Sequence, residues 1–67
     1  MVPTRIGRVI RGLRLKRGYR QIDLAKRAKV TNIYLSQLET GKKRNPSLDV
    51  LKKVAKALGV PVTELLE

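Results

Sequence analysis

The sequence predicts a small all-α fold of five helices, and three observations support this prediction. Apolar residues recur at helical spacing in successive stretches of the 67-residue chain, and no segment shows the alternation of a β-strand. Residues suited to capping helices stand between these stretches. Two Tyr are the only aromatic residues, so the core must be built from Leu, Ile, Val and Ala. A chain this short holds one domain, which we place at residues 1–67.

A first helix is predicted over roughly residues 5–17. Thr4 suits its N-cap and Gly18 its C-terminal stop, whereas Leu15 falls outside the apolar stripe. The stripe recurs at i, i+3, i+4 and i+7 and consists of Ile6, Val9, Ile10 and Leu13.

Two shorter helices follow, joined by about three residues. One runs over residues 21–28, and the next begins after the N-cap residue Thr31 and ends near Gly41. So short a link is too tight for a relaxed antiparallel pair and favours a sharp corner. The expected buried residues are Leu24, Ala25 and Ala28 in the second helix and Leu35 and Leu38 in the third.

Two further helices complete the prediction. A turn at residues 45–47 ends with the capping residue Ser47, and a fourth helix then runs over 48–58 to Gly59. A short fifth helix is predicted at 61–67, with Pro61 near its first turn. The apolar stripe of the fourth helix consists of Leu48, Leu51, Val54, Ala55 and Leu58.

Charge is the strongest compositional signal. The chain has 16 Lys and Arg against 5 Asp and Glu, a net charge of +11, with one basic run at Lys42-Lys43-Arg44. A domain this basic attracts polyanions such as nucleic acids. The alternative is a surface tuned for solubility, but solubility needs far less charge, and self-repulsion at +11 opposes folding.

The composition excludes several classes of function. Without Cys or His, the chain has no disulfide, no ordinary Cys/His zinc site, no Cys nucleophile and no His-containing catalytic triad. The acids are scattered, so we expect no enzyme, no metal, no cofactor and no small-molecule effector. No apolar run approaches the ~20 residues of a membrane span. Arginines interrupt the apolar residues near the N-terminus, which argues against a signal peptide, and we expect a cytoplasmic protein without membrane association.

One segment carries a recognisable motif. Residues 21–47 read QIDLAKRAKVTNIYLSQLETGKKRNPS, and matching positions extend outward to Ile10 and to the Leu-Gly-Val of residues 58–60. The landmarks are Gln21, Leu24-Ala25, Ala28, Val30, Thr31, Leu35, Leu38-Glu39-Thr40-Gly41 and Pro46-Ser47. In this register the segment resembles the helix-turn-helix of the phage repressor and Cro-like (Xre-type) family. The resemblance implies a lambda-repressor-like domain whose second and third helices form the motif. It also implies a transcriptional regulator that binds double-stranded DNA through the major groove.

The third helix is expected to read bases. Asn and Gln form bidentate hydrogen bonds with adenine, and apolar side chains contact the thymine methyl group. An ordinary solvated face would more often carry Lys and Glu. The base-reading candidates are Asn32, Ile33, Tyr34, Ser36 and Gln37.

Phosphate contacts are expected on both sides of that helix. The free N–H groups and the dipole at the start of the second helix favour an anion, and the basic run follows the third helix. For the basic run, the alternative is a solvated turn. The phosphate candidates are Arg20, Gln21, Thr31, Lys42, Lys43 and Arg44.

Arg14 and Glu39 are interpreted as structural rather than catalytic. The resemblance implies that they form a partly buried salt bridge between the first and third helices. Removing one partner of such a pair leaves the other charge buried without a counter-charge.

Three residues depart from the family pattern. Lys29 stands at a turn position where the family often has Gly, and if that position needs a positive φ, Lys costs about 1 kcal/mol. Arg20 replaces the usual Ser or Thr cap and is expected to exchange a capping bond for a phosphate contact. Pro61 replaces a polar cap before the last helix.

Two functional interpretations stay open at this stage. A sequence-specific regulator uses the amide-bearing face of the third helix, whereas a scaffold of the antitoxin or coactivator type works through protein contacts and does not need that face. The resemblance implies a homodimer, at least on DNA, with half-sites about one helical turn apart. Val62, Leu65 and Leu66 are the expected dimer surface, unless they simply cover the core.

Overall fold

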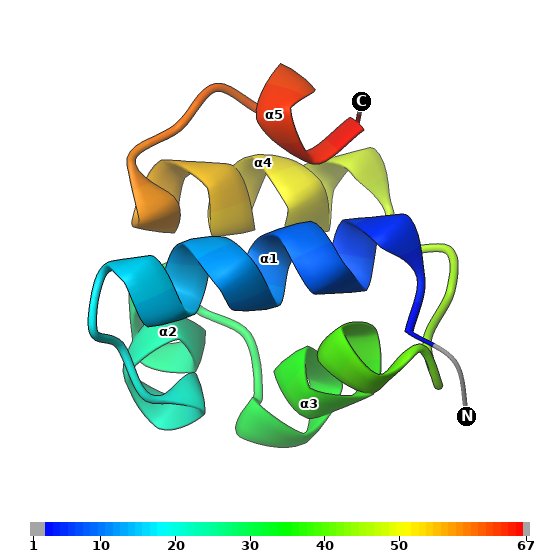
Figure 1. Ribbon diagram of the computed structural model, residues 1–67, viewed down its shortest axis with the longest axis horizontal. Helices are drawn as coiled ribbons and strands as arrows, with labels where there is room; N and C mark the ends of the chain where they lie inside the picture. The colour runs from blue at the N-terminus through cyan, green and yellow to red at the C-terminus, as the bar shows by residue number, and fades with distance from the viewer. Residues whose placement is uncertain (1–2, 67) are drawn as a thin grey trace.

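The computed structural model describes residues 3–66, which form five α-helices and no strand (Figure 1). The predicted all-α fold is therefore confirmed. The helices are α1 (Arg5–Lys16), α2 (Gln21–Ala28), α3 (Asn32–Thr40), α4 (Leu48–Leu58) and α5 (Thr63–Leu66). In this part of the chain, no helix is long and apolar enough to cross a lipid bilayer.

Local capping interactions set the helix starts. The Thr4 hydroxyl accepts the Gly7 N–H at 3.0 Å, and the Ser47 hydroxyl accepts the Val50 N–H at 3.2 Å. Gly59 ends α4 in the left-handed region at φ 74°, where a residue without Cβ is unstrained. The first four helices accordingly lie within a residue or so of their predicted bounds.

The fifth helix is shorter than predicted. It starts at Thr63 rather than at Pro61 and makes a single turn. The N–H groups of Glu64 and Leu65 donate to the carbonyls of Pro61 and Val62 at 3.0 and 2.9 Å, the i to i−3 spacing of a tight turn. The predicted end at residue 67 lies outside the described residues.

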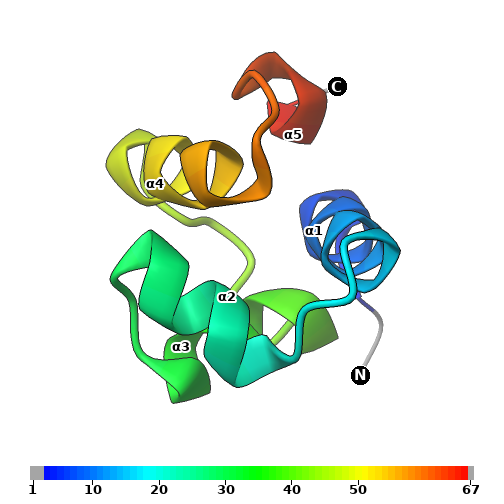
Figure 2. The ribbon, with the colours of Figure 1, turned by 90° about the vertical axis from the view of Figure 1, so that its left-hand side faces the viewer.

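The helices surround one core. In Figure 1, α1 lies between α4 and α3, and Figure 2 also places α4 and α3 at opposite ends of the molecule. α3 packs on α1 and α2, while α4 packs on α2 from the other side. Every helix contributes to the core, whose largest fully buried side chains are Ile10, Leu24, Leu35, Leu38, Val54, Leu58 and Leu65.

This packing corrects part of the expected dimer surface. Leu65 is 0% exposed and belongs to the core, so it is not available to a second copy. Val62 is half-buried against the same core, and Leu66 is 51% exposed. The short α5 packs on α1 and α4, and its one turn directs Leu65 inward while Leu66 stays outside.

Candidate nucleic-acid interface

A tight corner joins α2 to α3. Lys29 ends α2 at φ 58° and ψ 41°, and it is the only non-glycine residue with positive φ among residues 3–66. The Val30 N–H donates to the Ala25 carbonyl at 3.0 Å, and the Thr31 hydroxyl caps α3 by accepting the Tyr34 N–H at 3.0 Å. The chain therefore turns within three residues, and Lys29 bears the left-handed strain that glycine would avoid.

One face of α3 is buried, and on the other face the first two residues of the helix are exposed. Its buried residues are Leu35, Leu38 and Glu39. Asn32 and Ile33 are exposed, Ile33 to 72%. The other base-reading candidates are half-buried: Tyr34, Ser36 and Gln37.

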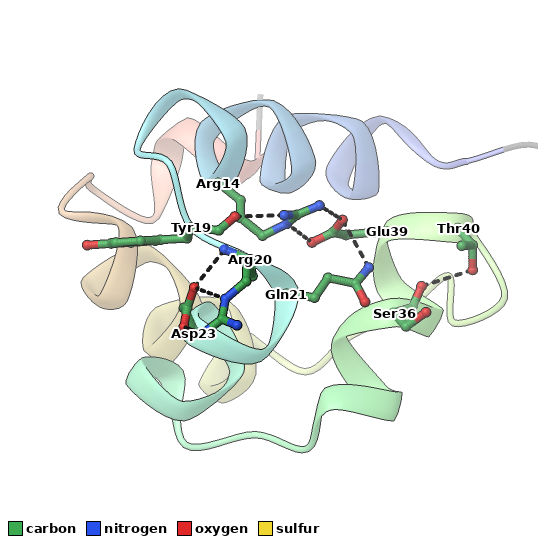
Figure 3. Close-up of polar contacts among 8 residues, drawn as sticks. All are labelled: Arg14, Tyr19, Arg20, Gln21, Asp23, Ser36, Glu39 and Thr40. Atoms are coloured by element: carbon green, nitrogen blue, oxygen red, sulfur yellow. Dashed lines mark hydrogen bonds and ion pairs between the residues drawn. The ribbon is translucent and has the colours of Figure 1, made fainter.

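Ser36 and Gln37 are therefore less exposed than Asn32 and Ile33. The Lys43 N–H donates to the Gln37 carbonyl at 3.0 Å, which shows that the chain after α3 folds back over the end of the helix. The Thr40 hydroxyl donates to the Ser36 carbonyl at 3.0 Å (Figure 3). The Lys43 ammonium lies 6.0 Å from the centre of the Tyr34 ring, at the outer limit of a cation–π contact.

A buried ion pair ties α1 to the helix-turn-helix. Arg14 donates from Nε to Glu39 Oε2 at 2.8 Å and from Nη2 to Glu39 Oε1 at 2.9 Å (Figure 3). Its Nη1 donates to the Tyr19 carbonyl at 2.8 Å, and the Gln21 amide donates to Glu39 Oε1 at 3.3 Å. No buried side-chain nitrogen or oxygen in residues 3–66 lacks a partner. The network therefore links α1, the start of α2 and α3 through hydrogen-bonded polar groups.

The two phosphate candidates at the start of α2 are engaged within the protein. The Arg20 guanidinium donates to both carboxylate oxygens of Asp23 at 3.0 Å, and the Arg20 backbone N–H donates to the same carboxylate at 2.9 Å. These hydrogen bonds lower the pKa of Asp23 to about 2. The Gln21 amide points inward to Glu39, whereas the Arg20 side chain stays 79% exposed in its pair with Asp23.

The expected loss of a cap from the Arg20 side chain is confirmed, because that side chain accepts no backbone N–H, whereas its phosphate contact stays a prediction. Asp23 stands at the third position of α2 and accepts the N–H of the preceding cap residue, as the acid of a capping box does. The Asp23 carboxylate therefore caps the start of α2 and also binds the Arg20 guanidinium.

The other phosphate candidates lie at the two ends of α3. Thr31 is exposed at its start, where the hydroxyl accepts the capping bond and can still donate its hydrogen. The basic run Lys42, Lys43 and Arg44 is exposed after its end. The bond between Gln21 and Glu39 brings the start of α2 to the same end of α3 that this run follows.

Sequence reasoning missed Gly7. A Cβ at this position would overlap the Leu38 carbonyl oxygen and lie 3.3 Å from the Glu39 carbonyl oxygen, whereas a Cβ at Gly12 would meet nothing within 4 Å. Gly7 therefore lets α1 lie directly on the backbone of α3. Its spacing of three residues before buried Ile10 placed it on the apolar stripe and could have indicated this close approach.

Comparison with known proteins gives several relatives. A family model described as Helix-turn-helix matches residues 10–65. The HTH-type transcriptional regulator SlrR of Bacillus subtilis (strain 168) is 45% identical over 62 residues, which are 92% of this chain and 41% of SlrR. The immunity repressor protein of Bacillus phage phi105 is 36% identical over 61 residues, 91% of this chain and 42% of that protein. The chain spans about half the length of the curated relatives it matches.

Two solved structures resemble the whole arrangement. The biofilm master regulator SinR in complex with DNA superposes with a TM-score of 0.90 at 40% identity, covering 92% of this chain and 98% of that one. The restriction-modification controller protein C.AhdI from Aeromonas hydrophila gives a TM-score of 0.86 at 34% identity and 91% coverage of both chains. The chain belongs to the helix-turn-helix family of phage-repressor and Cro-like (Xre-type) domains.

Proposed function

We propose that this chain binds double-stranded DNA sequence-specifically, with α3 in the major groove, and so regulates transcription. The proposal rests on the fact that α3 is held firmly on one face and exposed at its start on the other. Its inner face is locked by the core and the Arg14–Glu39 pair, while Asn32 and Ile33 project into solvent. The likeness to SinR in its DNA complex supports the same placement.

The dimensions and chemistry of α3 suit base reading. Nine residues make a helix roughly 13 Å long, and the major groove, about 12 Å wide, admits one helix. Asn32 and Gln37 carry amides that can bond adenine edges, and Ile33 can contact a thymine methyl group. Tyr34 and Ser36 complete the proposed reading set.

Phosphate contacts would then fix the register of α3 without specifying sequence. We assign them to the start of α2 and to both ends of α3. Arg20 and Gln21 belong to this set, but each must first give up a bond within the protein. Arg20 would exchange its bond to Asp23, and Gln21 its bond to Glu39, for a bond to a phosphate oxygen. Thr31, Lys42, Lys43 and Arg44 complete the set.

We further infer that the chain acts by binding rather than by catalysis. Three of its five acidic side chains are paired with basic ones: Glu39 with Arg14, Asp23 with Arg20, and Asp49 with Lys53 at 3.6 Å. Action on bacterial or phage DNA, as for the named relatives, implies a cytoplasmic location. We propose binding as a homodimer on two half-sites, with Leu66 rather than Leu65 available to the partner.

Selection from random duplexes followed by footprinting tests the proposal and yields the preferred site. Gln37→Ala should then weaken binding to that site by about 1–3 kcal/mol and leave binding to a random duplex almost unchanged. Lys43→Ala should weaken both by a similar factor and make the slope of log K against log salt shallower by about one.

Thermal melts of both variants check that the domain stays folded. Equal loss on the selected and random duplexes for Gln37→Ala would show that α3 does not read bases. The protein-contact scaffold would then be the better account of this fold.

A further inference from the structure

Two arginines of α1 have no role in the interface described so far. Arg8 and Arg11 are exposed, stand one turn apart, and form no ion pair within residues 3–66. We propose that they bind the DNA backbone, so that α1 is a further phosphate-anchoring element between the start of α2 and the chain after α3. This inference rests on the proposed function.

The pair lines a surface pocket between α1 and the helix-turn-helix. Across from Arg8 and Arg11, the pocket is lined by Gln21 at the start of α2 and by Thr40 at the end of α3. Gln21 is itself one of the proposed phosphate contacts, and Thr40 stands two residues before the basic run that begins at Lys42. The pocket is therefore continuous with the proposed DNA-binding surface rather than a separate site.

The close packing at Gly7 produces this placement. Because α1 lies on the α3 backbone at Leu38, the next turn of α1 stands beside the end of α3. Arg8 and Arg11 follow Gly7 by one and four residues, and Gly12 leaves its part of the pocket wall without a side chain. A bulkier residue at this crossing would hold both guanidinium groups away from the surface that α3 exposes.

The charge of the pocket selects an anion. The acid lining its described part is Glu39, whose carboxylate is neutralised by Arg14 at 2.8 and 2.9 Å. Arg8 and Arg11 therefore leave two uncompensated positive charges at the rim. Guanidinium groups match phosphate oxygens by paired hydrogen bonds, which a lysine ammonium does not.

A second basic groove does not have these properties. It is lined by Arg27, Lys29, Lys53 and Lys56 between α2 and α4. Arg27 stacks on Tyr19 at 4.6 Å, and Lys53 is paired with Asp49. α4 lies on the opposite side of the molecule from α3 (Figures 1 and 2), so its lysines serve as a control for loss of charge alone.

The test compares two double variants that remove the same charge. Arg8→Gln with Arg11→Gln should weaken binding about tenfold on both a selected and a random duplex. The slope of log K against log salt should become shallower by about 0.9 for each phosphate that the variant no longer neutralises. Lys52→Gln with Lys56→Gln, on exposed positions of α4, should leave the slope unchanged.

A conservative variant guards against misfolding as an explanation. Arg8→Lys with Arg11→Lys keeps the charge and should keep the salt slope while losing part of the affinity. Equal slopes and affinities for the two glutamine double variants would overturn the inference, as would loss confined to the selected duplex. If instead the unaltered protein does not distinguish the two duplexes, the proposed function itself fails, which is a separate result.

Discussion

At the residue scale, Glu39 is the side chain on which the interface depends most. Its carboxylate accepts two bonds from Arg14 and one from Gln21, so one acid joins three helices. Both members of the pair are buried, with 9% and 2% of their side chains exposed. A buried pair of this kind is tolerated because each of its buried nitrogen and oxygen atoms has a hydrogen-bond partner.

Glu39→Ala should lower the free energy of unfolding by about 3 kcal/mol, because Arg14 is left buried without its counter-charge. Adding Arg14→Leu should recover part of the loss. Chemical denaturation of both single variants and the double variant measures the coupling. Simple additivity of the two single effects would contradict it.

A surface pair provides the control. Asp49→Ala removes the exposed partner of Lys53, which lies 3.6 Å away. That change should alter stability by less than about 1 kcal/mol, because solvent screens an exposed pair.

At the scale of single helices, α1 contains two glycines with opposite surroundings. Gly7 lies against the Leu38 carbonyl, whereas the Gly12 Cβ position is open. Gly12 lies in the helix interior, where Gly is less favourable than Ala by about 1 kcal/mol, whereas Gly7 lies in the first turn. The same substitution should therefore have opposite effects at the two sites.

Gly7→Ala should destabilise the domain by about 1–3 kcal/mol, because the new methyl group overlaps rigid backbone and α1 must move from α3. Gly12→Ala should stabilise it by up to about 1 kcal/mol. Thermal or chemical unfolding of the two variants measures both signs. Stabilisation by Gly7→Ala would mean that α1 does not approach α3 this closely in solution.

The start of α2 should make acid stability depend on Asp23. Hydrogen bonds from Arg20 lower the pKa of Asp23 from its ordinary 3.8 to about 2 in the folded protein. The folded state therefore gains stability from the ionised carboxylate above pH 4, and that gain is lost as the pH falls from 4 to 2.

Asp23→Asn should remove the part of the stability loss between pH 4 and pH 2 that comes from this carboxylate. Melting temperatures of the unaltered protein and the variant, measured from pH 6 to pH 2, should differ most above pH 4 and converge toward pH 2. A difference that stays constant over the whole range would show that Asp23 is not held by Arg20.

At the scale of the whole molecule, the net charge of +11 dominates. The domain measures only 26 × 23 × 21 Å, so the basic side chains stand close together. Self-repulsion opposes the compact state, and a polyanion relieves it. Binding should accordingly release counterions in proportion to the phosphates contacted.

The slope of log K against log salt should be roughly −4 to −8 for a dimer on its site. Titrations of a labelled duplex at several salt concentrations measure the slope, with melting temperatures recorded under each condition to confirm that the domain is folded. A slope near zero would contradict the electrostatic argument and the proposal of DNA binding with it.

The first four helices and the caps of three of them could be predicted from the sequence. Thr4, Thr31 and Ser47 each accept an N–H three residues later, and the apolar stripes depend on spacings of three and four residues. Such interactions are local, so they can be identified without knowing where the helices lie. The same spacing in α2, with Asp23 three residues after Arg20, could have predicted that pair.

How those helices pack together could not be predicted in the same way. The burial of Leu65, the contact of Gly7 with the Leu38 backbone, the inward turn of Gln21 and the folding of Lys43 onto Gln37 depend on where helices and loops come to rest. The contact between Gly7 and Leu38, and the bond between Gln21 and Glu39, join residues far apart in the sequence. Local spacing shows that a side chain can be buried or exposed, but the position of its neighbours determines which occurs.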